Sequence, residues 1–226
     1  MLAIIIPYRA STQPERAEQL AKLRETIVTH LPEAFVAVIE QDDDRPFNRG
    51  ALLNTAIDCM GLGADATMCF HDVDLLPQED ILDAYRDPLP KNTVRHIGHA
   101  WKRYNSDSYL GGILMIRSGD FLAINGFPND FWGWGGEDDE LRDRITRSKM
   151  NIERPKGTII DQEALSLEQK MIHLKQTNQK CPDKWERREW HRAHPNQLGI
   201  HQLDYQVTQV MLESKKWIHF KVKIFN

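Results

Sequence analysis

The amino-acid sequence predicts an α/β protein, built as a single domain around one open, twisted, mostly parallel sheet flanked by helices. Short apolar runs alternate with segments of helical periodicity over residues 2–70, and this order is typical of strand-helix-strand units with parallel strands. The chain has 226 residues, 41% of them hydrophobic. That is enough to bury one substantial core, so one domain over residues 1–226 is expected.

The first strand-helix-strand unit begins at the start of the chain. Residues 2–6 are an apolar, β-branched run that Pro7 ends, and a loop is expected from there to Pro14. Apolar side chains then recur at helical spacing over residues 15–30, and residues 35–39 form a second apolar run. The pattern indicates a buried strand, a helix and a second strand.

The alternation continues along the chain. Residues 51–60 carry apolar side chains on one helical face, and residues 66–70 form a third apolar run. Residues 109–116 read as a strand entered through a glycine pair, and residues 137–150 as a helix. Ligands of such sheets bind in a crevice at the carboxyl ends of the strands, so the polar residues that follow these runs are the first candidates for a site.

A long polar segment covers residues 175–197. It contains two prolines, two tryptophans and two histidines, and it has no apolar periodicity. Loops of this length are uncommon unless they act as lids or are disordered. The segment is therefore expected to be a mobile loop.

The charge and the opening of the chain exclude some classes of protein. The formal net charge is −4, and lysine and arginine are spread along the chain, which argues against a nucleic-acid partner. The apolar opening is far shorter than a membrane span, and no signal-like cleavage region follows it. A soluble, cytoplasmic protein without a transmembrane segment is expected.

Two aspartates follow the third apolar run. Asp72 and Asp74 flank Val73, and because strand side chains alternate between faces, both carboxylates point the same way. Two hard oxygen donors at the carboxyl edge of a sheet suit Mg²⁺ or Mn²⁺ bound to a diphosphate. By itself, such a pair is more often a turn with solvated aspartates.

A second cluster lies at residues 131–139. Glycines alternate there with Trp132 and Trp134, which is suited to stacking on the apolar face of a sugar, and three acids follow at the predicted helix start. Carboxylates at a helix N-terminus also stabilise the helix dipole, so capping is the alternative reading. The density of glycine and tryptophan favours a binding site.

These segments together resemble the β-1,4-galactosyltransferase family. The resemblance rests on residues 131–139, on Asp72-Val73-Asp74, on Phe47-Asn48-Arg49 and on the opening Ile6-Pro7-Tyr8-Arg9, in matching order along most of the chain. It implies a GT-A fold, a UDP-galactose donor, an acceptor sugar, Mn²⁺ as cofactor, and inversion at the anomeric carbon.

The same resemblance implies a role for individual residues. Asp138 matches the catalytic base, Gly135 and Asp139 match acceptor contacts, and Asp74 and His173 match metal ligands. The matched donor and nucleotide contacts are Pro7, Tyr8, Arg9, Phe47, Arg49, Asp72, Val73, Tyr109, Trp134 and Glu137. Direct displacement needs one carboxylate to take the acceptor proton and one metal to neutralise the departing UDP, which agrees with this assignment.

Two positions depart from the family pattern. Many relatives have a methionine ligand where this chain has Lys170, and a branch that transfers galactose to xylose has a second histidine where this chain has Lys175. A third protein ligand is therefore open between Met171, His191, His194 and water.

Other readings remain open at this point. Tyr109 matches a position where a bulky side chain crowds the second carbon of the donor sugar, so UDP-galactose is expected rather than UDP-N-acetylgalactosamine.

Two other functions are alternatives. A nucleotidyltransferase usually has a glycine-rich phosphate loop after its first strand, which residues 7–14 lack. A sugar-binding module without catalysis would not need Asp74 and Asp138. Vertebrate members are secretory and membrane-anchored, so the missing anchor predicts a cytoplasmic bacterial enzyme or a chain without its anchor.

Overall fold

The computed structural model describes residues 1–9, 15–104 and 106–225, and it confirms the predicted α/β class. Two sheets lie in this part of the chain. The large sheet has the strand order β7 (Asn151–Glu153), β5 (Thr93–His96), β6 (Ile113–Arg117), β3 (Thr67–His71), β1 (Leu2–Tyr8), β2 (Phe35–Gln41), β10 (Trp217–Ile224) and β9 (Tyr205–Ser214). The small sheet pairs β4 (Leu75–Pro77) with β8 (Ile159–Asp161).

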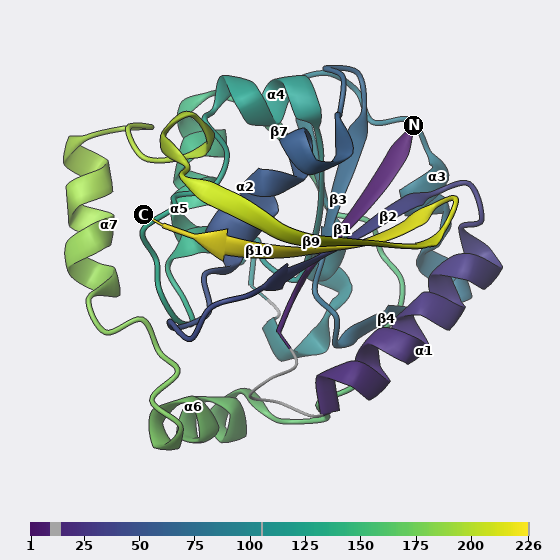
Figure 1. The fold of residues 1–226 in the computed structure, drawn as a ribbon, viewed down its shortest axis with the longest axis horizontal. Helices are drawn as coiled ribbons and strands as arrows, with labels where there is room; N and C mark the ends of the chain where they lie inside the picture. Colours follow the sequence, from purple (N-terminus) through teal and green to yellow (C-terminus); the bar gives the residue numbers. More distant parts are fainter. Residues whose placement is uncertain (10–14, 105, 226) are drawn as a thin grey trace.

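Helices cover both faces of the large sheet (Figure 1). One face packs against α2 (Arg49–Met60), α4 (Ser118–Ala123) and α5 (Glu137–Arg147), and the other against α1 (Glu15–His30) and α3 (Asp83–Arg86). Two further helices, α6 (Leu167–Gln176) and α7 (Lys184–Ala193), lie at the margin of the molecule. Short 3₁₀ turns are η1 (Glu79–Ile81), η2 (Ile97–Ala100), η3 (Lys102–Tyr104) and η4 (Ile200–Gln202).

The central strand β1 shows why the apolar opening folds as it does. Ala3 and Ile5 pack against the α2 side of the sheet, whereas Ile4 and Ile6 pack against the α1 side, and all four are fully buried. A strand with both faces covered reads as a continuous apolar run. β1 pairs in parallel with both β2 and β3, so the carboxyl ends of the three strands share one edge.

Several predicted boundaries move in the structure. β1 continues through Pro7 to Tyr8, and residues 10–14 of the expected loop lie outside the described residues. The strand expected over 109–116 begins only at Ile113, because Gly112 has φ +80°, which breaks the extended backbone. The helix expected over 137–150 ends at Arg147.

The expectation of a long loop over residues 175–197 is wrong in part, since α7 occupies its second half. The inner face of α7 is polar: Arg188 pairs with Asp143 at 3.1 Å and His191 with Asp130 at 2.9 Å. A helix whose buried side chains are charged gives no apolar periodicity. The sequence pattern therefore could not indicate it.

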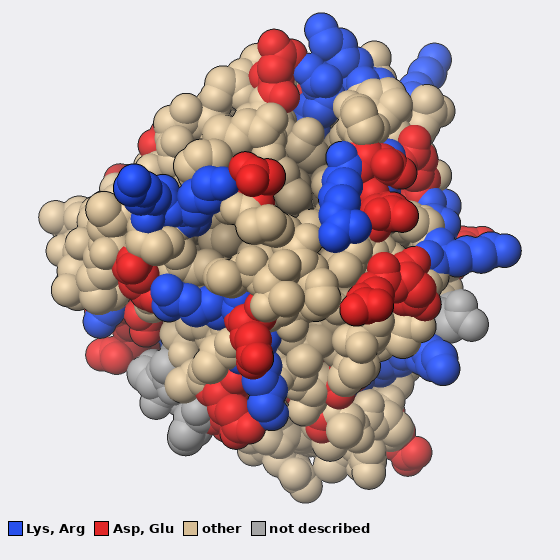
Figure 2. All heavy atoms as spheres, turned by 90° about the vertical axis from the view of Figure 1, so that its right-hand side faces the viewer, with Lys and Arg blue, Asp and Glu red and all other residues tan. Residues whose placement is uncertain are grey.

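In residues 1–9, 15–104 and 106–225, no helix is long and apolar enough to cross a membrane. On the face shown in Figure 2, basic and acidic side chains alternate over short distances.

Candidate active site

The site is built at the shared carboxyl edge of β1, β2 and β3. β3 ends at His71, immediately before Asp72, and β2 leads into the first turn of α2, where Arg49 is the first helical residue. Asn48 caps α2, accepting a hydrogen bond from the Ala51 N–H at 3.0 Å and donating from Nδ2 to the Asn129 carbonyl at 2.6 Å. The cap thereby ties the start of α2 to the segment that precedes α5.

Arg49 joins the two acidic clusters that the sequence singled out. Its Nε donates to Asp72 Oδ1 at 2.8 Å, and its Nη1 donates to Asp138 Oδ1 at 2.8 Å, with Glu137 Oε1 3.8 Å away. The Arg49 side chain is only 12% exposed. One buried guanidinium thus fixes carboxylates that lie far apart in the sequence on either side of it.

Burial changes the acidity of these groups. It raises the pKa of Asp72 and of Asp138, although Arg49 acts in the opposite direction on each. Burial, followed by repulsion from Asp138, raises the pKa of Glu137 to about 8. A carboxylate with a raised pKa accepts a proton more readily near neutral pH, which is the property that a general base needs.

The turn before β6, at Gly111 and Gly112, lies in close contact with Asp72 and Asp138. The Asp72 N–H donates to the Gly112 carbonyl at 2.9 Å. A Cβ at Gly111 would lie 2.2 Å from Asp138 Oδ2 and 2.7 Å from the Tyr109 hydroxyl, so this position has no room for a side chain. Tyr109 is partly buried and stacks on Tyr104 with ring centroids 4.5 Å apart. Its hydroxyl lies near Asp138, since both meet the same Cβ position at Gly111.

The tryptophan-glycine segment, residues 131–136, borders the candidate site at the start of α2. The Gly133 N–H donates to the Phe47 carbonyl at 2.8 Å, which joins this segment to the start of α2. Trp134 is 36% exposed, and its backbone is hydrogen-bonded to Gln179 at 2.7 Å and Cys181 at 3.1 Å. An exposed aromatic ring is therefore attached to the connection between α6 and α7.

The remaining predicted donor and acceptor residues lie on neighbouring segments. Arg9 donates to the carbonyls of Asp43 and Arg45, both at 2.7 Å, and its guanidinium lies 6.0 Å from the centre of the Phe47 ring. Asp139 lies on the first turn of α5, where Arg188 of α7 approaches to 3.5 Å.

Asp74 pairs with a second arginine, Arg16, in an adjoining ionic cluster that sequence reasoning missed. Arg16 Nη1 is 3.0 Å from Asp74 Oδ2, and Arg16 Nη2 is 3.0 Å from Glu163 Oε1. Glu163 also pairs with Lys170 at 2.6 Å and with Arg103 at 2.9 Å. Nothing in the sequence distinguishes Arg16 from the solvated charges of an ordinary helix.

Two models of known protein families match consecutive parts of this chain, and they show which family it belongs to. The N-terminal region of glycosyl transferase group 7 matches residues 1–86, and a model described as the N-terminal domain of galactosyltransferase matches residues 92–166. Together they span well over half of the chain. The chain belongs to the β-1,4-galactosyltransferase family.

Individual members of this family are similar over most of the chain. Mouse β-1,4-galactosyltransferase 4 is 35% identical over 164 residues, which are 70% of this chain and 46% of the mouse protein. Fruit-fly (Drosophila melanogaster) β-1,4-galactosyltransferase 7 is 30% identical over 218 residues, which are 92% of this chain and 64% of the fly protein. The chain thus spans less than two thirds of the length of these relatives.

A solved structure of the fly enzyme has the same fold. The crystal structure of the catalytic domain of Drosophila β-1,4-galactosyltransferase 7 in complex with xylobiose superposes with a TM-score of 0.76 at 27% identity, covering 100% of this chain and 94% of that chain. This agreement confirms the GT-A architecture expected from the resemblance.

The prediction of a cytoplasmic bacterial enzyme is wrong, because the matching galactosyltransferases are eukaryotic proteins of mouse and fruit fly. The prediction started from the apolar opening of the chain. That opening is the buried central strand of the sheet, and a core strand carries no information on cellular location.

The family implies a divalent metal ion. The residues expected to bind this ion are only partly arranged for it in the structure. Asp72 and Asp74 supply hard carboxylate oxygens, which suits Mn²⁺. His173 is exposed on α6, and in the described part of the chain no three His, Cys, Asp or Glu side chains lie together so as to hold a metal ion. His173 therefore does not complete a metal-binding group with Asp72 and Asp74 in this arrangement of α6.

The other candidates for a third ligand are engaged elsewhere. His191 is buried, bonded to Asp130 and stacked on Phe131 at 5.6 Å between ring centroids. His194 stacks on Trp190 at 4.4 Å. The hydrogen bonds of these two histidines go to Asp130 and to the Trp190 carbonyl, and not to Asp72 or Asp74.

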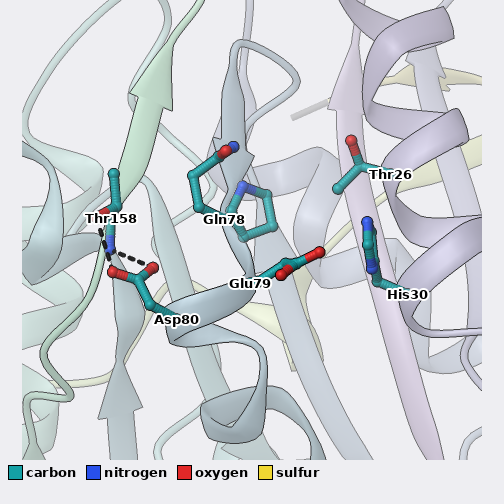
Figure 3. A pocket seen from close by; sticks show the side chains of 7 residues that line it. Thr26, His30, Gln78, Glu79, Asp80 and Thr158 are labelled. Atoms are coloured by element: carbon teal, nitrogen blue, oxygen red, sulfur yellow. Dashed lines mark hydrogen bonds between the residues drawn. The ribbon is translucent and has the colours of Figure 1, made fainter.

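A cavity of about 590 Å³ lies outside the candidate site, between α1, the end of β4, η1 and Thr158 just before β8 (Figure 3). Its lining residues are Thr26, His30, Pro77, Gln78, Glu79, Asp80 and Thr158. None of them is a predicted site residue, and Asp80 is already bonded to Thr158 at 2.8 Å.

Proposed function

We propose that this protein is a manganese-dependent, inverting glycosyltransferase that moves galactose from UDP-galactose to a hydroxyl of an acceptor sugar. The observation that carries the proposal is the Arg49 bridge, which holds Asp72 and Asp138 in one site. The fold neighbours support the ligands: a variant of the fly enzyme was crystallised with manganese, UDP-Gal and xylobiose.

In this proposal Asp138 is the general base. The acceptor oxygen bonds to the anomeric carbon of galactose while the bond from that carbon to the UDP oxygen breaks. The acceptor proton passes to Asp138, whose pKa burial has raised. Because the acceptor oxygen attacks directly, no covalent intermediate forms and the anomeric configuration inverts.

Asp74 would hold the metal and His173 would join it after α6 closes, while Asp72 would face the nucleotide sugar. The bound ion would neutralise the charge that develops on UDP. Arg16 now lies against Asp74, so its guanidinium must give up this contact when a cation binds there.

The other predicted residues surround the two substrates. Pro7, Tyr8, Arg9, Phe47 and Val73 would contact the nucleotide, and Glu137, Tyr109 and Trp134 the donor sugar. Gly135 and Asp139 would contact the acceptor. Gly135 has φ +99°, a conformation that lets its backbone approach a ligand closely.

The function is tested by measuring UDP release from UDP-galactose with Mn²⁺ across a panel of acceptors. The panel contains xylosides, N-acetylglucosamine, glucose and a blank without acceptor. We expect acceptor-dependent release with at least one sugar, and no release with that sugar after Mn²⁺ is chelated. Equal UDP release with and without every acceptor would contradict the proposal.

Donor choice should depend on Tyr109. Its hydroxyl lies beside Gly111 and Asp138, where an acetamido group on the donor sugar would clash with it. The native protein is expected to prefer UDP-galactose over UDP-N-acetylgalactosamine, and Tyr109→Leu should raise the relative rate with the latter by about tenfold or more. Initial rates with the two donors check this. A native preference for the acetamido donor would move the function to N-acetylgalactosamine transfer.

Residues 175–197 should close over the site. Backbone hydrogen bonds join Trp134 to this segment, and Trp185 of α7 is 64% exposed, so little apolar burial holds α7 in place. Limited proteolysis should cut this segment in the free protein and cut it several-fold more slowly with UDP-galactose plus Mn²⁺. UDP-galactose with a chelator is the control, and identical cleavage under all conditions would argue against a lid.

A further inference from the structure

His96, the last residue of β5, is fully buried and belongs to none of the predicted contacts. Its Nε2 lies 2.9 Å from the Gly111 carbonyl oxygen. Because a carbonyl can only accept, Nε2 carries the proton and donates it. Burial lowers the pKa of His96 to about 4, so the ring is neutral near neutral pH. Among the described residues, its Nδ1 has no hydrogen-bond partner.

Gly98 packs against the Gly111 carbonyl on the same side as His96. A Cβ at Gly98 would lie 2.4 Å from the Gly111 carbonyl oxygen and 2.9 Å from His96 Nε2. The backbone of η2 therefore lies directly against this hydrogen bond, and the Gly111 carbonyl has no space to move toward η2.

The opposite side of Gly111 touches the reacting groups. An added Cβ there would meet Asp138 Oδ2 and the Tyr109 hydroxyl, as described above. The His96 ring also lies edge-on to Tyr109, with ring centroids 5.6 Å apart. Gly111 is thus held between His96 on one side and Asp138 and Tyr109 on the other, and a shift of its backbone changes the position of both.

We propose that His96 is a positioning residue, which fixes the turn from Tyr109 to Gly112 so that Asp138 and Tyr109 keep the geometry for transfer and for donor choice. This inference rests on the proposed function. Misplacing a reacting group by about 1 Å costs up to about a hundredfold in rate. His96 would therefore act on the rate and the donor preference, with little effect on nucleotide binding.

The test compares two substitutions of this histidine. His96→Phe keeps a ring of similar size but removes the donor, and His96→Gln keeps an N–H near the place of Nε2. We expect His96→Phe to lower kcat with UDP-galactose by about tenfold to a hundredfold, to leave KM for UDP-galactose within about twofold, and to weaken the preference over UDP-N-acetylgalactosamine. His96→Gln should restore most of both losses.

Val94→Ala is the matched control. Val94 is fully buried on the same strand and the same face of it, so this change should lower stability without altering the donor preference. An activity-independent readout is amide hydrogen exchange at Ile113, whose N–H bonds to Gly111, and at Asp72, whose N–H bonds to Gly112. Both amides should exchange faster in His96→Phe by more than its loss of global stability accounts for, whereas in Val94→Ala any increase should match the loss of global stability.

The outcomes separate this inference from the function itself. If the native protein transfers galactose and His96→Phe matches it in kcat and donor preference, the positioning role is wrong while the function stands. If His96→Phe and Val94→Ala change activity, donor preference and exchange alike, His96 is merely structural and the inference is also wrong. If the native protein does not transfer galactose, both proposals fail.

Discussion

Replacing Asp138 with Asn is expected to slow galactose transfer by a factor on the order of 10³ while leaving the affinity for UDP nearly unchanged. The amide has the shape of the carboxylate and can still accept the hydrogen bond that Arg49 Nη1 donates at 2.8 Å, so the site keeps its form. It cannot take the acceptor proton. Initial rates under saturating Mn²⁺ and calorimetric titration with UDP measure the two quantities.

Asp143→Asn is the control for this substitution. Asp143 lies on the same helix and pairs with Arg142 and Arg188, so its replacement removes a carboxylate without touching Asp138. It should leave the rate within a few-fold of the native value. Loss of UDP affinity in Asp138→Asn with turnover retained would show that Asp138 serves binding and is not the base.

Removing a metal ligand should change the dependence on manganese. Asp74→Ala is expected to raise the Mn²⁺ concentration for half-maximal rate by at least about tenfold, and to weaken Mn²⁺ binding without donor to a similar extent, because it deletes a carboxylate ligand. His173→Ala should shift the rate curve in the same direction. Because His173 joins the site only on closure, its effect on Mn²⁺ binding without donor should be smaller.

His201→Ala is the control for the histidine. His201 is exposed on η4, and its replacement should leave the manganese curve unchanged. The same result with His173→Ala would mean that the histidine is not a ligand. Unchanged Mn²⁺ binding in Asp74→Ala would place the metal elsewhere in the protein.

Local periodicity determined much of the fold. Helix α1 has the predicted bounds, Glu15–His30, because its buried Leu23 and Ile27 recur at helical spacing. The strands β1, β2 and β3 were predicted from apolar runs whose two faces are both buried. The residues that form each of these patterns lie within a few positions of one another, so the patterns can be recognised in the sequence without knowledge of any tertiary contact.

The candidate site was predictable where its residues cluster in the sequence. Asp72 and Asp74 follow one strand, and residues 131–139 combine glycine, tryptophan and acid. The order of these segments also indicated the family, which the matches over residues 1–86 and 92–166 confirm. Their individual roles remain predictions that the substitutions above test.

Only the tertiary structure decided how these segments meet. The bond from Arg49 to Asp138 spans 89 residues, and the bond from Arg16 to Glu163 spans 147. Contacts between charged side chains so far apart leave no periodic pattern, because each partner alone resembles a solvated surface residue. The polar inner face of α7 stayed hidden for the same reason, and so did the hydrogen bond from His96 that fixes Gly111.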